Sequence, residues 1–104
     1  MAKSNLEAFK QFVEKDPNNS FARYSLAMEY RKAGQLNAAL ATFEELIVRD
    51  PNYLATYLMA AQVALDLDRI ERAREIIAQG TEIARTLNNQ HAASELASLL
   101  DSVG

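Results

Sequence analysis

Cysteine and tryptophan are absent from the 104-residue chain, which also holds only three glycines and two prolines. Without cysteine it can form no disulfide, no thiol nucleophile and no thiolate metal ligand. With so few turn-forming residues, little of it can be irregular. The formal net charge is −3 and no block of basic residues occurs, so nucleic acid is not an expected partner.

Long apolar runs are also missing. No stretch approaches the roughly 20 apolar residues that a membrane span requires, so we expect no membrane span. The opening residues MAKSNLEAFK lack the apolar core of a secretory signal peptide. We therefore expect a cytoplasmic protein, with residues 1–104 forming a single domain.

Strand signals are lacking, whereas apolar residues recur at intervals of three and four almost throughout. This spacing predicts an all-α chain with helices at residues 5–15, 20–33, 37–48, 53–67, 70–86 and 90–102. The connections between them are short, and short connections make neighbouring helices antiparallel.

Local signals set the ends of these helices. Ser4 and Glu7 form a capping box at the first start, and Asn37 is the expected cap of the third helix. Gly34 should end the second helix in the left-handed conformation, with Asp68 in the same role one helical pair later.

The sequence Asp-Pro-Asn occurs twice, at 16–18 and 50–52, which is an interval of 34 residues. Side-chain size also repeats by position at this interval. The repeated positions hold Leu26, Ala27, Tyr30, Ala39, Phe43 and Pro51, followed by Tyr57, Ala60, Ala61, Ala64, Ala73 and Ile77. Arg23 departs from the pattern where an aromatic is expected, and Arg85 stands where the second closing proline would be.

These residues resemble the signature of the tetratricopeptide repeat (TPR) family, a helix–turn–helix unit of 34 residues. The resemblance implies an α-solenoid of antiparallel helical hairpins. It predicts an N-terminal half-unit at 4–17, a first unit at 18–51, a second unit at 52–86 and a capping helix at 88–103. The capping helix should turn one apolar face, with Leu96, Leu99, Leu100 and Val103, towards the stack.

Function in this family resides in a concave groove lined by the first helix of each unit. The helical period predicts that the groove is lined by Phe21, Tyr24, Ser25, Met28, Arg31, Lys32, Leu58, Met59, Gln62 and Leu65. We call the six bulky apolar members the apolar patch: Phe21, Tyr24, Met28, Leu58, Met59 and Leu65. Such a patch, if exposed, is typical of an interaction site. Alternatively, the capping helix curls over and buries part of it.

The resemblance therefore implies a non-enzymatic module that binds a protein or peptide ligand in the groove. The alternative is structural self-association, as a homo-oligomer formed through the groove or the N-terminal helix. Some family members clamp a C-terminal carboxylate with Lys and Asn. Here the corresponding places hold Phe21, Ser25, Ala55 and Met59, so we do not expect that chemistry.

Candidate chemical groups are few. His91 and Glu95 are four residues apart and could touch one metal ion, but zinc sites need three or four ligands. A serine nucleophile would have only His91 as a base. Gly80 lies within a predicted helix, where it favours close helix contact over phosphate binding. We predict no catalytic residue, no metal and no cofactor.

Overall fold

The chain folds into α-helices joined by short turns. The computed structural model describes residues 5–103, and within that range six helices form. They are α1 (Leu6–Lys15), α2 (Ser20–Lys32), α3 (Leu36–Arg49), α4 (Ala55–Asp66), α5 (Ile70–Thr86) and α6 (Gln90–Val103). The predicted Ser4 cap lies outside the described residues. The expected all-α class is confirmed.

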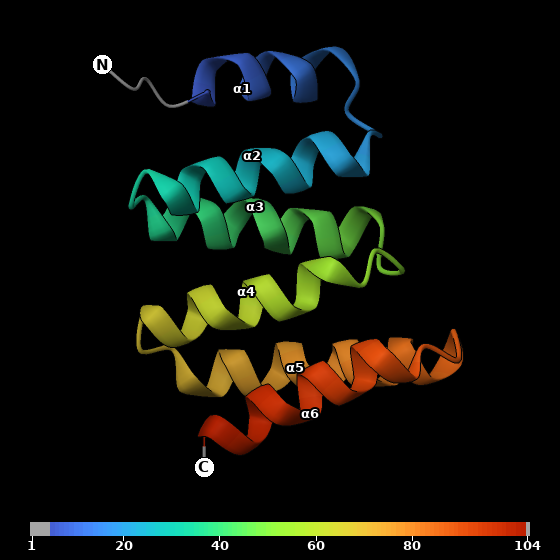
Figure 1. Cartoon of the computed structure of the whole chain (residues 1–104). Helices are drawn as coiled ribbons and strands as arrows, with labels where there is room; N and C mark the ends of the chain where they lie inside the picture. Colours follow the sequence, from blue (N-terminus) through green and yellow to red (C-terminus); the bar gives the residue numbers. More distant parts are fainter. Residues whose placement is uncertain (1–4, 104) are drawn as a thin grey trace.

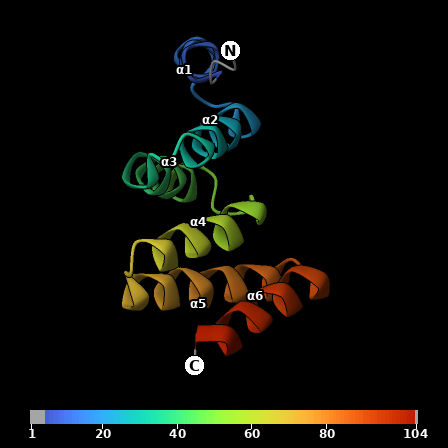
Figure 2. The same cartoon turned by 60° about the vertical axis from the view of Figure 1, so that its left-hand side comes forward.

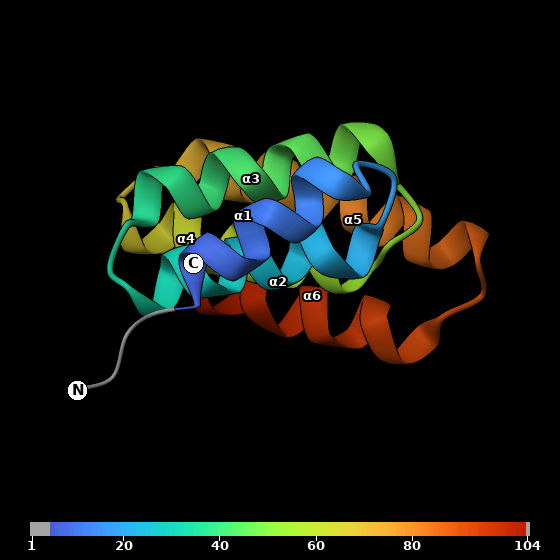
Figure 3. The same ribbon diagram turned by 90° about the horizontal axis from the view of Figure 1, so that it is seen from above.

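The helices stack in chain order, each antiparallel to the one before it (Figure 1). The most extensive contacts join α2 to α3 and α4 to α5, and α4 also contacts α6. Figure 2 shows the same row from another side, with α1 and α6 at its two ends. Viewed from above, α3 and α5 lie along one side while α2 and α6 lie along the other (Figure 3).

Two kinds of turn join the helices. The turns after α2, α4 and α5 contain Gly34, Asp68 and Asn88 with φ of 78°, 60° and 56°. In each, the next amide donates back to a carbonyl five residues earlier, as Gln35 N does to Tyr30 O at 2.9 Å. The left-handed conformation predicted for the first two residues is confirmed. By contrast, α1 and α3 end at Asp-Pro pairs, because a residue before proline avoids helical angles.

The starts of α3 and α4 differ from the predicted ones in ways that have a structural reason. Asn37 is not a cap, because α3 already begins at Leu36; the Asn37 side chain accepts a hydrogen bond from Arg69 instead, at 2.6 Å. The fourth helix begins at Ala55 rather than at Tyr53, whose amide belongs to the turn and donates to Asp50 O at 3.1 Å. The other helix ends differ by one residue or not at all.

The core follows the repeated positions. Small side chains stand where helices approach, and Ala27, Ala39, Ala60, Ala61, Ala64 and Ala73 are all fully buried. Phe43 and Tyr57 fill the space beside them and are also fully buried. Tyr30 is only half-buried, with the Lys10 ammonium 5.8 Å from its ring centroid, and Pro51 is exposed in its turn. Small and large residues therefore interlock along the row.

Gly80 shows how closely α4 and α5 approach. A Cβ atom at this position would lie 2.6 Å from Cβ and 2.7 Å from Cγ of Tyr57, and 3.0 Å from a Leu96 methyl. Only glycine fits there, so the predicted role in close helix contact is confirmed. The ring of Tyr57 occupies the space and its hydroxyl donates to the Pro51 carbonyl at 2.5 Å.

The charged side chains of α5 form contacts with α3 as well as with one another. Arg72 donates to Glu44 on α3 at 2.6 Å and to Glu75 on its own helix at 3.1 Å. The hydrogen bond to Glu44 is the main cause that raises the pKa of Arg72. Together with the Arg69–Asn37 bond, this pair links the second helices of adjacent hairpins.

Candidate functional site

The predicted groove face runs along α2 and α4. Only Phe21 and Lys32 of the ten predicted lining residues are exposed, and Phe21 is the most open, with 66% of its surface accessible. The other eight are half-buried: Tyr24, Ser25, Met28, Arg31, Leu58, Met59, Gln62 and Leu65. The apolar patch is therefore less exposed than the helical period alone suggested.

The five half-buried members of the apolar patch pack against the core. Tyr24 illustrates the reason: its ring centroid lies 5.8 Å from that of Phe43, edge to face, and 5.7 Å from that of Tyr53. Burial, followed by the neighbouring Tyr53, raises the pKa of Tyr24. The patch thus forms a firm apolar floor from which Phe21 projects.

Helix α6 lies beside Leu58 and Gln62 on α4, as in the alternative in which the capping helix covers part of the patch. A shallow cleft of about 390 Å³ lies between α4 and α6, lined by Leu58, Gln62, Glu95, Ser98, Leu99 and Ser102. Glu95 and Ser98, which line this cleft, are exposed. The expected apolar face also differs, since Leu96 is buried but Leu100 is 43% exposed. The repeat signature does not extend into α6, so no pattern fixed its rotation.

The charged end of the groove lies near the C-terminus of α2. A hollow of about 430 Å³ there is lined by Met28, Glu29, Arg31 and Lys32. Glu29 accepts a hydrogen bond from the Asn5 amide at 3.1 Å, which connects this end of α2 to the start of α1. An apolar floor with a basic rim can hold a peptide that carries both apolar and acidic side chains.

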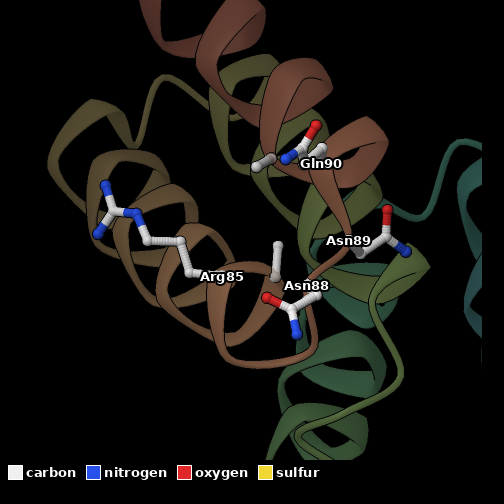
Figure 4. A pocket seen from close by; sticks show the side chains of 6 residues that line it. Arg85, Asn88, Asn89 and Gln90 are labelled. Atoms are coloured by element: carbon white, nitrogen blue, oxygen red, sulfur yellow. The ribbon is translucent and has the colours of Figure 1, made fainter.

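A smaller pocket of about 150 Å³ lies at the turn between α5 and α6 (Figure 4). Its lining includes Asn88, Asn89 and Gln90, and Arg85 points away from these side chains. The Asn89 side chain accepts from the Ala92 amide at 2.9 Å, as expected of a helix cap. The polar groups here serve the turn and the start of α6.

Metal and catalytic chemistry finds little support in the described part of the chain. His91 Nε2 lies 3.5 Å from Glu95 Oε1 on the open surface of α6, where 86% of the His91 side chain is accessible. Residues 5–103 contain no group of three or more potential metal ligands. None of the helices in that range is both long and apolar enough to cross a membrane.

The comparisons with known proteins agree with this arrangement. Two family models, both described as tetratricopeptide repeat, match residues 30–100 and 8–41. A tetratricopeptide repeat domain protein from Salinibacter ruber, solved by NMR, is 40% identical; the match covers 85% of this chain and 89% of that one, with a TM-score of 0.80. No functionally curated protein matches the chain.

Two further solved structures share the fold at low identity. The TPR2B domain of yeast Sti1, in a complex with pHsp70, is 19% identical and has a TM-score of 0.86 over 94% of this chain and 78% of that one. PcrH, in a complex with the chaperone binding region of PopD, is 17% identical and has a TM-score of 0.85 over 94% of this chain and 74% of that one.

Proposed function

Because the chain belongs to the tetratricopeptide repeat family, we propose that it is a non-enzymatic module whose groove binds a peptide or protein segment. The observation that carries the proposal is the set of half-buried apolar side chains on α2 and α4, beside the exposed Phe21 and the cleft between α4 and α6. The structures of Sti1 and PcrH, which contain segments of other proteins, support the same use of the fold.

The groove is suited to binding because it is already organised. Tyr24, Met28 and Leu58 pack against buried residues, so little side-chain freedom remains to be lost when a ligand binds. The two methionines of the floor, Met28 and Met59, can adjust to side chains of different shape. Affinity would then depend on a few anchors, of which Phe21 offers the largest accessible apolar surface.

Peptides selected on the protein from a displayed random library provide the test. Phe21→Asp should weaken binding of the selected peptides at least tenfold, which corresponds to about 1.4 kcal/mol. Val48→Asp is the matched control, because Val48 is equally open, with 77% accessible, but lies on α3 outside the groove. Equal affinity for wild type and Phe21→Asp would refute the groove assignment.

A second candidate function is self-association through α1. Helix α1 stands at the end of the row and exposes Phe12, with 55% of its surface accessible; the Phe9 ring lies 5.9 Å from it, edge to face. No described helix lies beyond α1 at this end (Figure 1). Light scattering over a concentration series decides between the candidates: a dimer that Phe12→Ser dissociates supports self-association, and a monomer at all concentrations excludes it.

A further inference from the structure

A pocket outside the groove lies at the edge where α1 turns into α2 and α3 turns into α4. Its volume is about 210 Å³, and it is lined by Pro17, Asn18, Ser20, Arg23, Leu46, Arg49 and Asp50. The three connections between α1 and α2, α3 and α4, and α5 and α6 share this edge (Figure 1). The pocket is many times larger than the roughly 30 Å³ that one water occupies in the liquid.

The pocket exists because Arg23 replaces an aromatic residue. One repeat later, the ring of Tyr57 fills the corresponding space and its hydroxyl donates to the Pro51 carbonyl. Arg23 donates to the equivalent carbonyl, Pro17 O, at 2.9 Å. The guanidinium therefore keeps the hydrogen bond of the tyrosine, but its thin side chain leaves the volume of the ring open.

Two guanidinium groups meet in this pocket. Burial and the nearby charge of Arg49 both lower the pKa of Arg23, while Glu45 opposes the change. Within residues 5–103, no carboxylate lies in ion-pair range of Arg23. Arg49 is paired through its Nε with Glu45 at 2.7 Å. Since a guanidinium has five N–H donors, both arginines retain donors for a ligand.

The third polar wall is the Asp50 carboxylate. Ser20 Oγ donates to Asp50 Oδ2 at 2.5 Å and holds the carboxylate in place. A fully ionised ligand would be repelled by Asp50. A ligand that carries both negative oxygens and a hydroxyl can place the oxygens on the arginines and donate the hydroxyl to Asp50. Phosphate at neutral pH has this combination, whereas sulfate has only acceptor oxygens.

We propose that the pocket formed by Arg23, Arg49 and Asp50 is a binding site for a phosphate group. Arg23 and Arg49 donate to its oxygens through charge-assisted hydrogen bonds. Asp50 accepts from its hydroxyl and discriminates against sulfate. The phosphate can be the free ion, or a monoester in the monoanionic form that keeps a hydroxyl below its second pKa of about 6. The pocket opens to solvent, so the rest of a monoester can lie outside it.

The test follows the arginine Nε–H and backbone amide signals by NMR, while sodium phosphate replaces sodium chloride at constant ionic strength. We expect saturable shifts at Asn18, Ser20, Arg23 and Arg49, with at least tenfold weaker binding of sulfate. Shifts that rise linearly without saturation, or that equal those caused by sulfate, would overturn the proposal.

Three variants sharpen the result. Arg49→Gln, at an exposed position, should weaken phosphate binding at least tenfold, whereas Arg74→Gln, an exposed arginine on α5, should leave it unchanged. Asp50→Asn should reduce the preference for phosphate over sulfate. Equal phosphate affinity in wild type and Arg49→Gln would overturn the proposal even if the shifts saturate.

A parallel titration with O-phosphoserine at about pH 5.5, where much of the monoester keeps its hydroxyl, distinguishes the two sources of phosphate. Saturable binding of both phosphoserine and inorganic phosphate indicates that the pocket accepts a monoester. Binding of inorganic phosphate alone indicates a site for the free ion. Binding of neither, under conditions in which the protein is folded by circular dichroism, refutes the site.

Discussion

The α2–α3 and α4–α5 hairpins place side chains of different size at two equivalent pairs of positions. In α2–α3, the slender Arg23 faces the large Leu46, and a pocket remains between them. In α4–α5, the large Tyr57 faces Gly80, and no room remains for even one carbon. Both hairpins keep the hydrogen bond to a proline carbonyl. The comparison teaches that the hydrogen bond to the proline carbonyl recurs in both hairpins although a different residue type donates it.

The largest expected effect comes from removing the ring of Tyr57 from the closely packed α4–α5 hairpin. Tyr57→Ala removes a fully buried ring and should lower the free energy of unfolding by about 3 to 5 kcal/mol, as for other large buried rings. The equivalent Arg23→Ala should cost only about 1 kcal/mol, since it removes one hydrogen bond of a half-buried side chain and no buried ring. Urea unfolding of both variants measures the difference, and similar losses would show that the hairpins do not differ as described.

Gly80→Leu tests the close contact between Gly80 and Tyr57 from the side of α5. The new side chain would collide with Tyr57 Cβ and Cγ, which are not flexible ends, so we expect a loss of about 1 to 3 kcal/mol. In the double variant Tyr57→Ala/Gly80→Leu, the leucine can occupy the vacated space. Its loss should therefore be smaller than the sum of the two single losses. Additive losses in thermal unfolding would argue against direct contact between these positions.

A stabilising change is expected at Thr56, the neighbour of Tyr57. This residue is fully buried and its hydroxyl has no hydrogen-bond partner, whereas the equivalent position of the other hairpin holds Ala22. Thr56→Val should raise the free energy of unfolding by about 1 kcal/mol, because an unsatisfied buried hydroxyl is costly. Thr42→Val, whose hydroxyl donates to Ala38 O at 2.8 Å, is the control and should bring no gain.

The smallest effect should come from the tyrosine hydroxyl. Tyr57→Phe should cost about 0.5 kcal/mol at pH 8, the low end for a hydrogen bond, because Pro51 is exposed and water can replace the hydroxyl. The measurement is the free energy of unfolding in urea. The control is Thr42→Val, which leaves this hydroxyl in place. An unchanged stability would show that the bond contributes nothing.

The stability difference between wild type and Tyr57→Phe should depend on pH. Burial, and then Asp50, raise the pKa of Tyr57 above 10.0. The neutral phenol is thus favoured in the folded state. The stability it provides is present below pH 10 and is lost as the pH rises through the raised value. The advantage of wild type over Tyr57→Phe should therefore shrink between pH 8 and pH 11, and a constant difference would contradict the shift.

Much of the fold could be predicted because its signals are local. The helical spacing from Ile70 to Thr86 identified α5 without error, and Gly34 and Asp68 marked two left-handed turns. The prediction that Asn37 caps the third helix was wrong because its side chain can also accept a hydrogen bond from a distant residue, here Arg69. That choice depends on a hairpin more than thirty residues away, which no local pattern contains.

The candidate site was only partly predictable for the same reason. A helical period identifies which residues share a face, but not what packs beside that face. The helical period groups Tyr24 and Leu58, yet their surroundings depend on Phe43, Tyr53 and α6, which come from other segments. Arg23 stood out in the sequence as a departure from the pattern. Its pocket emerges only when the fold brings Arg49 and Asp50 beside it.

The linear stacking of the helices also determines how the molecule comes apart. Helix α1 packs substantially against α2 alone, whereas α4 is held by α3, α5 and α6. Detaching α1 therefore breaks mainly its packing against α2, and the remaining helices keep their contacts with one another. Fraying should begin at this end and progress inward, so the N-terminal helix exchanges its amide hydrogens through local opening while the centre of the row requires global unfolding.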